Sequence, residues 1–274
     1  MKMPKSKLLN LPIIKPLVKY YVNYRVNKES IVIAEHFDQF LNSILVTDQE
    51  LRNAVHHIRY DVYCEELKFE PENEQKMEVD EFDAFSEFCM VQHRTTENFA
   101  GCVRIVCPKD SEQLLPLEKY CEDSITDEVL TPKNYSRESI CEVSRLAVPK
   151  QFRRRNSDKF EGAATGAFNE ELYSESEMRC FPFIAVGLYI CACHTVKRMG
   201  IEHAFVMMEP RLARSLKMLG INFTRIGPVV DYHGKRAPYH LSPEEFLEGL
   251  SPGFKRLSDN ISRSLAIQAE KNKQ

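Results

Sequence analysis

The order of apolar and polar positions along the chain predicts strands and helices that alternate around one sheet. The pattern predicts a first strand over 36–46, and then a capping box, Thr47-Asp-Gln-Glu50, that begins a helix. This helix is expected to run to about Leu67. Two strands are predicted at Phe88–Arg94 and Phe99–Val106, joined by a short polar turn.

The second half of the chain continues the alternation. A strand is predicted at Ile140–Val148, followed by an apolar, and therefore buried, helix between Pro182 and Gly200. The remaining predicted elements are a strand at His203–Met208, a short helix from Glu209 to Gly220, strands at Ile221–Ile226 and Val229–Tyr232, and a helix begun by a second capping box at Ser242–Glu245. Together these elements predict a single α/β (α+β) domain, with its main part at 36–250 and a helical tail at 251–274.

Several stretches lack an apolar period. The acidic segment FEPENEQKMEVDEFDAFS (69–86) has too few apolar residues for a core element, so it is predicted to be a long functional loop. Residues 108–138 are predicted to be irregular, and 158–179 to be a flap or a weak helix. The tail from Asn260 onward is expected to be helical or frayed.

Charge and cysteine content narrow the function classes. The 274 residues carry a net charge of -3, which gives no global signal for nucleic acid, so no nucleic-acid partner is expected. The nine cysteines show no paired metal-ligand spacing, so no metal site is predicted. We interpret most of them as small core residues of a reduced cytoplasmic protein, with a catalytic cysteine as the less favoured alternative.

The first 28 residues contain seven lysines and arginines and no acidic residue. Lysines interrupt the apolar run, so the segment does not resemble a secretory signal. No stretch of the chain reaches the ~20 apolar residues needed to cross a bilayer. Two interpretations of residues 1–35 remain: a poorly ordered basic arm, or a basic amphipathic segment that lies on an anionic membrane surface.

Charged residues inside apolar elements are the most informative positions of the sequence, because such residues are seldom buried without a partner. Each could belong to an ion pair that only ties the acidic loop to the sheet. Buried ion pairs stabilise a fold less well than apolar residues do, so several of them in one domain favour a site that uses charge. The positions are Arg59 and Tyr63 on one helix face, Asp80 and Asp83 in the acidic loop, Arg104 in one strand, and Glu142 and Arg145 in another.

This pattern, together with Phe69 and the Gly101-x-x-Arg104 spacing, resembles the signature of the acyl-homoserine lactone synthases, which have a GNAT-like acyltransferase fold. Those enzymes have Phe at the position of Tyr63 and Trp at that of Phe69. A closer resemblance is to the PEP-CTERM/exosortase system-associated acyltransferases, relatives of the N-acyl amino acid synthases. It rests on segments such as RYDVYCEELKFE, EVDEFDAFS, EVSRLAVPKQFRRR and DYHGKRAPY, and it covers roughly residues 36–250.

The resemblance implies an acyltransferase that moves a fatty acyl group from a thioester to the amine of an amino acid or related acceptor. It implies catalytic roles for Glu142, Arg104 and Arg145. Glu142 is the candidate base; burial would raise its pKa and a nearby arginine would lower it. It also implies a substrate-binding group, formed by Arg59, Tyr63, Phe69, Asp80, Asp83 and Ser144.

The basic loop after Ile140–Val148 indicates which acyl donor the protein would use. Ordinary GNAT enzymes have a glycine-rich loop here whose N–H groups bind pyrophosphate. This chain instead has Lys150, Arg153, Arg154 and Arg155. That departure favours acyl carrier protein over coenzyme A as the donor, unless the loop is merely a solvated charge run. No tightly bound cofactor is expected.

An apolar slot for the acyl chain is expected beside the buried helix and the strand AFVMM, although such a stripe is more often plain core. The central sheet is expected to be mostly antiparallel and to splay near Ile140–Val148. Two alternatives stay open: lactone synthesis from S-adenosylmethionine, and a non-catalytic regulator that binds acyl carriers or lipids. Turnover of purified protein with acyl carrier protein and amines would separate the enzyme from the regulator.

Overall fold

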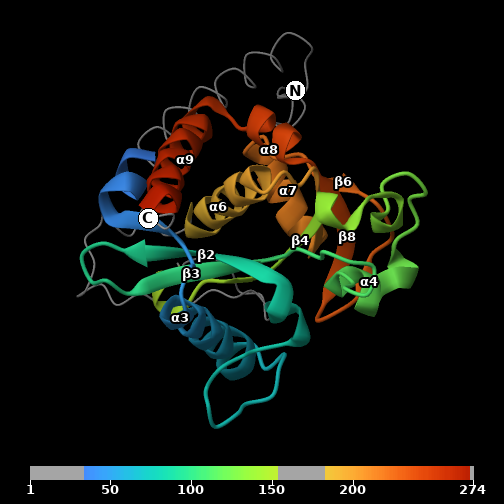
Figure 1. The fold of residues 1–274 in the computed structure, drawn as a ribbon, viewed down its shortest axis with the longest axis horizontal. Helices are drawn as coiled ribbons and strands as arrows, with labels where there is room; N and C mark the ends of the chain where they lie inside the picture. The colour runs from blue at the N-terminus through green and yellow to red at the C-terminus, as the bar shows by residue number, and fades with distance from the viewer. Residues whose placement is uncertain (1–33, 154–182, 272–274) are drawn as a thin grey trace, which may run out of the picture.

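A mixed sheet runs through the computed structural model, which describes residues 34–153 and 183–271 (Figure 1). The strands are β1 (Leu41–Leu45), β2 (Ser86–His93), β3 (Phe99–Val106), β4 (Ile140–Ala147), β5 (His203–Met208), β6 (Thr224–Arg225), β7 (Val230–Asp231) and β8 (Lys235–Leu241). Their order is β1-β2-β3-β4-β5-β8-β6, with β7 paired to β8. Among these pairs β4 and β5 are parallel and the rest antiparallel. The predicted single α/β domain with a mostly antiparallel sheet is confirmed.

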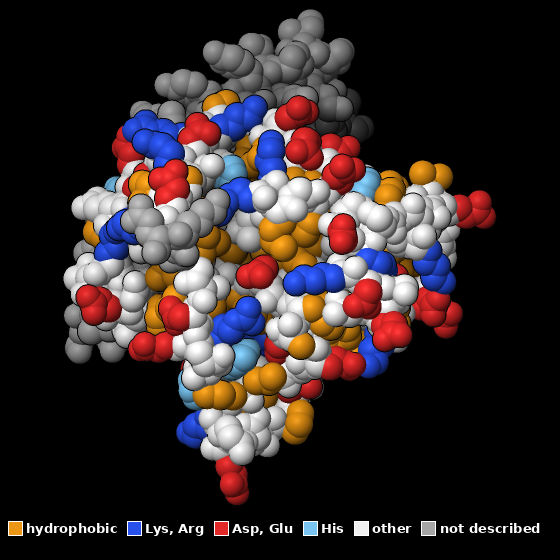
Figure 2. All heavy atoms as spheres, in the orientation of Figure 1, with side chains coloured by type: hydrophobic (Ala, Val, Ile, Leu, Met, Phe, Trp, Pro, Cys, Tyr) orange, Lys and Arg blue, Asp and Glu red, His pale blue; other side chains and the backbone are white. Residues whose placement is uncertain are grey.

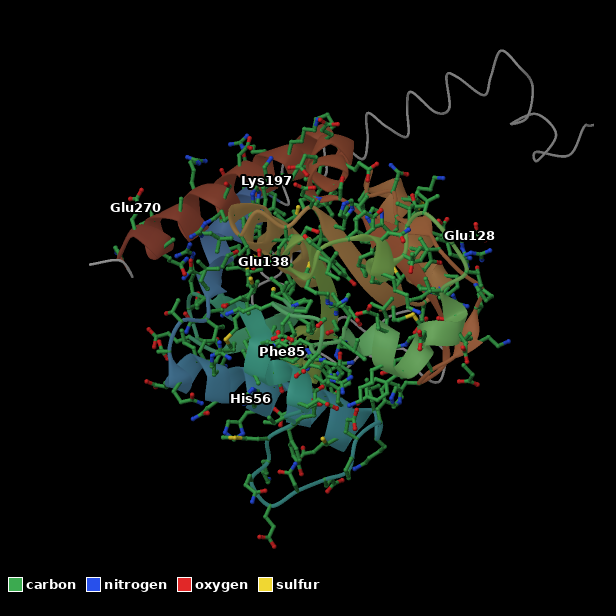
Figure 3. The ribbon with its side chains drawn as sticks, turned by 45° about the vertical axis from the view of Figure 1, so that its right-hand side comes forward. His56, Phe85, Glu128, Glu138, Lys197 and Glu270 are labelled. Carbon is green, nitrogen blue, oxygen red and sulfur yellow. The ribbon has the colours of Figure 1, made fainter. Side chains whose placement is uncertain are left out.

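Helices cover both faces of this sheet. The helices are α3 (Gln49–Arg59), α4 (Pro116–Cys121), α6 (Ile184–Arg198), α7 (Pro210–Met218), α8 (Pro243–Gly249) and α9 (Pro252–Lys271). The helix α3 packs on one face, whereas α6 packs on the other with α9 outside it (Figure 1). His56 on α3 and Lys197 on α6 accordingly lie on opposite sides of the sheet (Figure 3). The main hydrophobic core lies between the sheet and α6, as the apolar sequence of that helix predicts.

The start of the domain differs from the prediction at two points. Residues 34–40 are helical, and the first strand begins only at Leu41. The cap of α3 is Asp48, whose side chain accepts a hydrogen bond of 2.9 Å from the N–H of Leu51, so the predicted capping box at Thr47 is wrong by one residue. Aspartate and threonine are both good N-caps, and the sequence alone could not rank these neighbours.

The predicted helix to Leu67 changes its hydrogen bonding midway. The α-helix ends at Arg59 and continues as a π-helical segment, Tyr60–Glu66. Such wide turns are rare and are often found at functional sites. Short 3₁₀ turns occur elsewhere, at Glu81–Phe85, Glu122–Ser124, Pro132–Asn134, Arg137–Ser139 and Lys150–Phe152.

The acidic segment is largely a loop, as predicted, but it does enter the core. Phe82 is buried among apolar side chains, and Glu78 and Asp83 are buried beside it. The stretch therefore forms no long helix or strand, as expected, yet it contributes three buried side chains to the interior. Residues 108–138 also hold one short helix, α4, within an otherwise irregular course.

The end of the sheet was predicted least well. The expected strands at Ile221–Ile226 and Val229–Tyr232 shrink to the two-residue strands β6 and β7. The longer strand β8 was not predicted, because Pro238 lies inside it and proline lacks the N–H that a central strand donates. The capping box at Ser242 is confirmed at the start of α8.

The helix α9 closes the domain at the edge strand β1. The predicted polar tail is helical from Pro252 and buries Leu257, Ile261 and Leu265. Gln268 reaches β1: its Oε1 accepts a hydrogen bond of 3.0 Å from the N–H of Leu45, and its Nε2 donates one of 2.7 Å to the carbonyl of Ser43.

Candidate active site

The sheet opens between β4 and β5. These strands pair over Ile140–Glu142 and His203–Phe205 and then part. On its other edge, β4 bulges against β3, where the register jumps from Ser144 to Ala147. Within the bulge Arg145 has a φ of 49°, a left-handed conformation that is uncommon for a residue other than glycine. The predicted splay near Ile140–Val148 therefore exists, with a strained residue beside it.

Glu142 lies where the two strands begin to part. Its side chain is only 2% exposed, and its Oε2 accepts a hydrogen bond of 2.7 Å from the N–H of Leu117. Burial raises the pKa of this carboxyl to about 8, against the lowering effects of that hydrogen bond and of the charges on Arg104 and Arg145. Burial thus outweighs the nearby arginines, which answers the question that the sequence left open.

Among the described residues, Glu142 forms no ion pair with Arg59 or Arg104, the arginines that the sequence offers as its purely structural partners. Arg59 binds Glu78 and Asp83, the latter at 2.6 Å. Arg104 binds Asp83 at 2.9 Å. Glu142 is left as a buried carboxyl without an ion pair in the part of the chain that the structure describes, which is a costly arrangement typical of functional sites.

Arg104 and Arg145 complete a charged network beneath the acidic segment. Besides Asp83, Arg104 Nη1 binds Asp80 at 2.5 Å, and its Nε donates a hydrogen bond of 3.1 Å to Ser144 Oγ. Arg145 Nη2 lies 2.8 Å from Glu70 and 3.5 Å from Asp80. Ion pairs between the acidic loop and the sheet, which the sequence left open for these positions, are thus present and fix the acidic segment to the sheet.

Two members of the network were missed by sequence reasoning. Glu78 is 5% exposed, and it joins Arg59 to Arg145, whose Nε lies 3.2 Å from its Oε1. Glu70 is the other. Both lie in a stretch of many acidic residues, where nothing in the local pattern separates a buried carboxylate from a solvated one.

Tyr63 and Phe69 lie close to this network. The Tyr63 hydroxyl donates a hydrogen bond of 2.8 Å to the carbonyl of Leu146, inside the β4 bulge. The guanidinium of Arg145 lies 5.3 Å from the centre of the Tyr63 ring, within cation–π range. The ring of Phe69 contacts that of His233, with 5.1 Å between their centres.

A polar pocket of about 380 Å³ opens over the network. Its wall includes Glu70, Glu78, Asp80 and Arg145, and the aromatic side chains of Tyr120, Tyr232 and His233. Acidic and basic side chains are interspersed on the visible surface, with no large field of one sign (Figure 2). The pocket combines ion-pairing groups and ring faces, which suits a small polar molecule.

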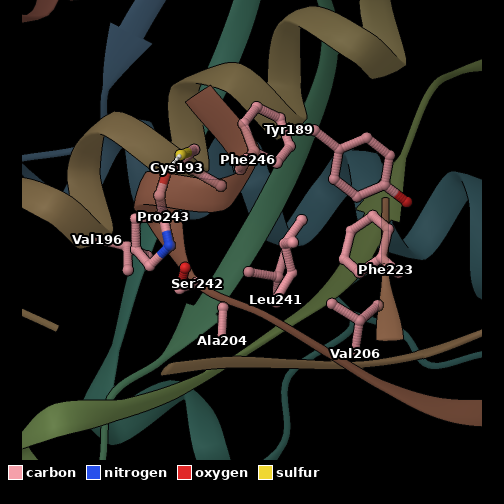
Figure 4. Close-up of a pocket in the computed structure, with 12 residues that line it drawn as sticks. Tyr189, Cys193, Val196, Ala204, Val206, Phe223, Leu241, Ser242, Pro243 and Phe246 are labelled. Carbon is pink, nitrogen blue, oxygen red and sulfur yellow. Dashed lines mark hydrogen bonds between the residues drawn. The ribbon is translucent and has the colours of Figure 1, made fainter. Parts of the chain in front are cut away.

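A second pocket is apolar and lies on the opposite side of β4. Val143 of β4, Ala204 and Val206 of β5, and Tyr189 and Ala192 of α6 line it (Figure 4). Its volume is about 30 Å³, room for about one water molecule, so the slot is nearly closed. The helix and strand expected to line an acyl slot do meet at this pocket.

The basic loop after β4 differs from the expectation. Arg153 is 9% exposed and forms an ion pair with Glu66, so it is not the exposed rim charge that the sequence predicted. Lys150 is exposed, and its backbone N–H donates to Glu66. Arg154 and Arg155 lie outside the described residues, as do the segment 158–179 and the basic arm 1–28.

The cysteines of the described ranges support the expectation of core residues. All eight are free and buried, and burial raises the pKa of each thiol. A reactive thiolate is therefore disfavoured among them. None of the described helices combines the length and the apolar character that crossing a membrane requires.

Comparisons with known proteins agree with this geometry. Residues 58–161 match a family model described as an acetyltransferase (GNAT) domain. No curated protein matches the chain. The chain thus has a GNAT-like fold in which residues 58–161 match an acetyltransferase domain, and the matched residues carry both Glu142 and the three network arginines.

Solved structures share the fold at low sequence identity. TofI, in a complex with an inhibitor and MTA, is 16% identical, with a TM-score of 0.55 over 76% of this chain and 95% of that one. The CoA-dependent acyl-homoserine lactone synthase BjaI, with SAM and isopentyl-CoA, is 15% identical, with a TM-score of 0.54 over 81% and 89%. FeeM, an N-acyl amino acid synthase from uncultured soil microbes, is 16% identical, with a TM-score of 0.50 over 77% and 94%.

Proposed function

We propose, from the premise that this chain has a GNAT-like fold with a match to an acetyltransferase domain, that it moves an acyl group from a thioester to the amine of an amino acid or related acceptor. One observation carries the proposal: Glu142 is buried where the sheet opens, with an apolar pocket on one side of its strand and a polar pocket on the other. The acyl chain would enter the apolar pocket and widen it, since the slot has a volume of only about 30 Å³, and the acceptor would enter the polar pocket.

The proposed reaction joins the two substrates at the open edge of β4. The amine nitrogen attacks the thioester carbonyl carbon, and its proton passes to the Glu142 carboxylate, directly or through a water. The C–N bond forms, the C–S bond breaks, and the leaving thiolate takes up the proton held by Glu142, which returns that residue to its carboxylate form. A pKa of about 8 lets this carboxyl exchange a proton near neutral pH, as a general base requires.

Two features of the chain would assist that step. The bulge at Arg145 interrupts strand pairing, and backbone N–H groups at such a bulge can donate to the developing oxyanion. The network of Arg59, Arg104 and Arg145 holds the acidic segment as one wall of the acceptor pocket. The network would position this wall rather than bind the acceptor's carboxylate, because each of these arginines is already bound to carboxylates of the chain.

We favour a protein-bound thioester as the donor. The segment after β4 lacks the glycines that wrap a pyrophosphate, and Lys150 there is exposed. This agrees with the resemblance to the PEP-CTERM/exosortase-associated acyltransferases. A coenzyme A thioester is the alternative donor. A lower kcat/KM with acyl carrier protein than with coenzyme A carrying the same acyl chain would overturn the preference.

The decisive experiment is turnover by the purified full chain. Acyl carrier protein loaded with acyl chains of several lengths, and the matching coenzyme A thioesters, are mixed with amino acids and simple amines. Mass spectrometry then follows the product. Catalytic formation of an N-acyl product supports the proposal, whereas stoichiometric binding of the acyl donor without product indicates the non-catalytic regulator.

A further inference from the structure

An amino acid acceptor carries a carboxylate, and no arginine of the charged network is free to bind it. Arg59, Arg104 and Arg145 are each bound to two or three carboxylates of this chain. A substrate carboxylate would have to displace one of those partners. The acidic residues on the wall of the polar pocket would also repel it.

Arg236 differs from these arginines. It forms no ion pair and no side-chain hydrogen bond with any described residue, and its Nε is buried without a partner. Leaving such a donor unsatisfied costs about 1–3 kcal/mol, so its presence needs an explanation. Arg59 also has one unpartnered nitrogen, but its side chain is fully buried beneath two carboxylates. Arg236 is partly exposed, so a ligand can reach it.

The strand register places Arg236 on the same face of the sheet as Glu142. Glu142 is the Cα partner of Phe205, and Phe205 is that of His240 on β8. Side chains alternate along a strand, so Arg236, four residues before His240, projects to this face as well. His233, three residues before Arg236, lines the polar pocket.

Electrostatic effects agree with a place between the two pockets. Burial lowers the pKa of His233, which lines the polar pocket, and the charge on Arg236 contributes to that lowering. It also acts to lower the pKa of Tyr189, which lines the apolar pocket, although burial raises that pKa overall. Tyr63, at the bulge, is affected in the same way as Tyr189. These smaller effects agree with the placement that the strand register gives, in which Arg236 lies near residues of both pockets without lining either one.

We propose that Arg236 binds the carboxylate of the acceptor and thereby selects amino acids over amines that lack an acid group. This inference rests on the proposed function. A guanidinium forms a two-point ion pair with a carboxylate, which fixes the orientation of the acceptor. The amino group of an acceptor held in this way is directed toward the polar pocket and Glu142.

The test compares amino acids with their carboxamides, which keep the amine but lose the charge. Each of a panel of L-amino acids and its carboxamide is assayed with one acyl thioester, using wild type and Arg236→Gln. We expect wild type to prefer the acid. In the variant, kcat/KM for the acid should fall roughly 10- to 100-fold, the worth of a charged hydrogen-bonded pair, with little change for the carboxamide. Lys235→Gln, an exposed neighbour on β8, is the matched control and should keep the wild-type ratio.

Two results would overturn the inference: a wild-type enzyme that uses carboxamides as well as acids, or an Arg236→Gln variant that keeps the wild-type ratio. If the glutamine variant does not fold, Arg236→Lys replaces it. This variant keeps the charge but not the planar guanidinium, and it should lose part of the preference for the acid over the carboxamide.

If wild type turns over no amine, the proposed function fails. Calorimetry with the same panel still decides the role of Arg236: binding lost in the variant supports it, and equal or absent binding refutes it.

Discussion

The carboxyl of Glu142 is held by the backbone N–H of Leu117, at 2.7 Å, from a helix that begins 26 residues earlier in the chain. This N–H belongs to the first turn of α4, where helix donors lack partners within the helix. The bond orients the carboxyl without neutralising it by an opposite charge. Glu142 is thus positioned firmly while its pKa stays high.

Replacing Glu142 by glutamine should lower kcat roughly 10²- to 10⁴-fold, the usual worth of a general base. Glutamine keeps an acceptor for the Leu117 N–H, so the variant should fold. Glu138→Gln, at an exposed position just before β4 (Figure 3), is the matched control and should keep full turnover. Steady-state assays with thermal melts measure both effects, and wild-type kcat in Glu142→Gln would exclude the base role.

The same substitution should change how stability depends on pH. The Glu142 pKa rises from 4.5 to about 8 on folding, so between these values the folded protein holds a proton that the unfolded chain has lost. This contribution is complete below pH 4.5 and is lost as pH rises through 8. The free energy of unfolding of wild type relative to Glu142→Gln should therefore fall by on the order of 3–5 kcal/mol between pH 4 and 9. Urea unfolding at a series of pH values measures this, and parallel pH curves would contradict it.

Asp83 should matter for stability more than an exposed acid does. It binds both Arg59 and Arg104, and their charges hold its pKa at about 2 although burial alone would raise it. Asp83→Asn should cost on the order of 3 kcal/mol, because two buried guanidiniums lose a charged partner. Glu72→Gln, which breaks the exposed pair with Lys68, should leave the unfolding curve unchanged. Equal midpoints for wild type and Asp83→Asn would show that the network does not stabilise the fold.

The apolar pocket should set the acyl-chain length. Phe223→Ala removes a ring from its wall and should shift kcat/KM toward longer chains, whereas Ala204→Leu fills the slot and should shift it toward shorter ones. One methylene in such a pocket changes selectivity roughly tenfold or more. Competition between acyl donors of different length reads the shift directly. If both variants keep the wild-type profile, the acyl chain binds elsewhere.

The sequence predicted the elements that have a strong apolar period. The buried helix α6 and the strands β2 to β5 lie within two or three residues of their expected ends, and the charged positions Arg59, Arg104 and Glu142 do converge on one site. A charged residue inside an apolar run can be recognised from the sequence alone. For this reason the centre of the candidate site could be predicted.

Residues whose role depends on distant partners could not be predicted. Glu78 is buried because Arg59 and Arg145 meet there, and its neighbours in the sequence are as acidic as it is. Arg236 lies on β8, a strand that was not predicted because Pro238 lies within it. Arg153 resembles an exposed charge in the sequence but is buried against Glu66, at the end of the π-helical segment that follows α3. These outcomes depend on tertiary contacts, which local pattern does not encode.

The contact of Gln268 with β1 bears on how the protein stays apart from other copies of itself. An edge strand offers free N–H and C=O groups that can recruit a strand from another molecule. One glutamine amide accepts from the N–H of Leu45 and donates to the carbonyl of Ser43, so these two backbone groups of β1 are already bonded. Gln268 of α9 therefore takes the position that a ninth strand would occupy beside β1. It covers the edge of the sheet that lies farthest from the two pockets.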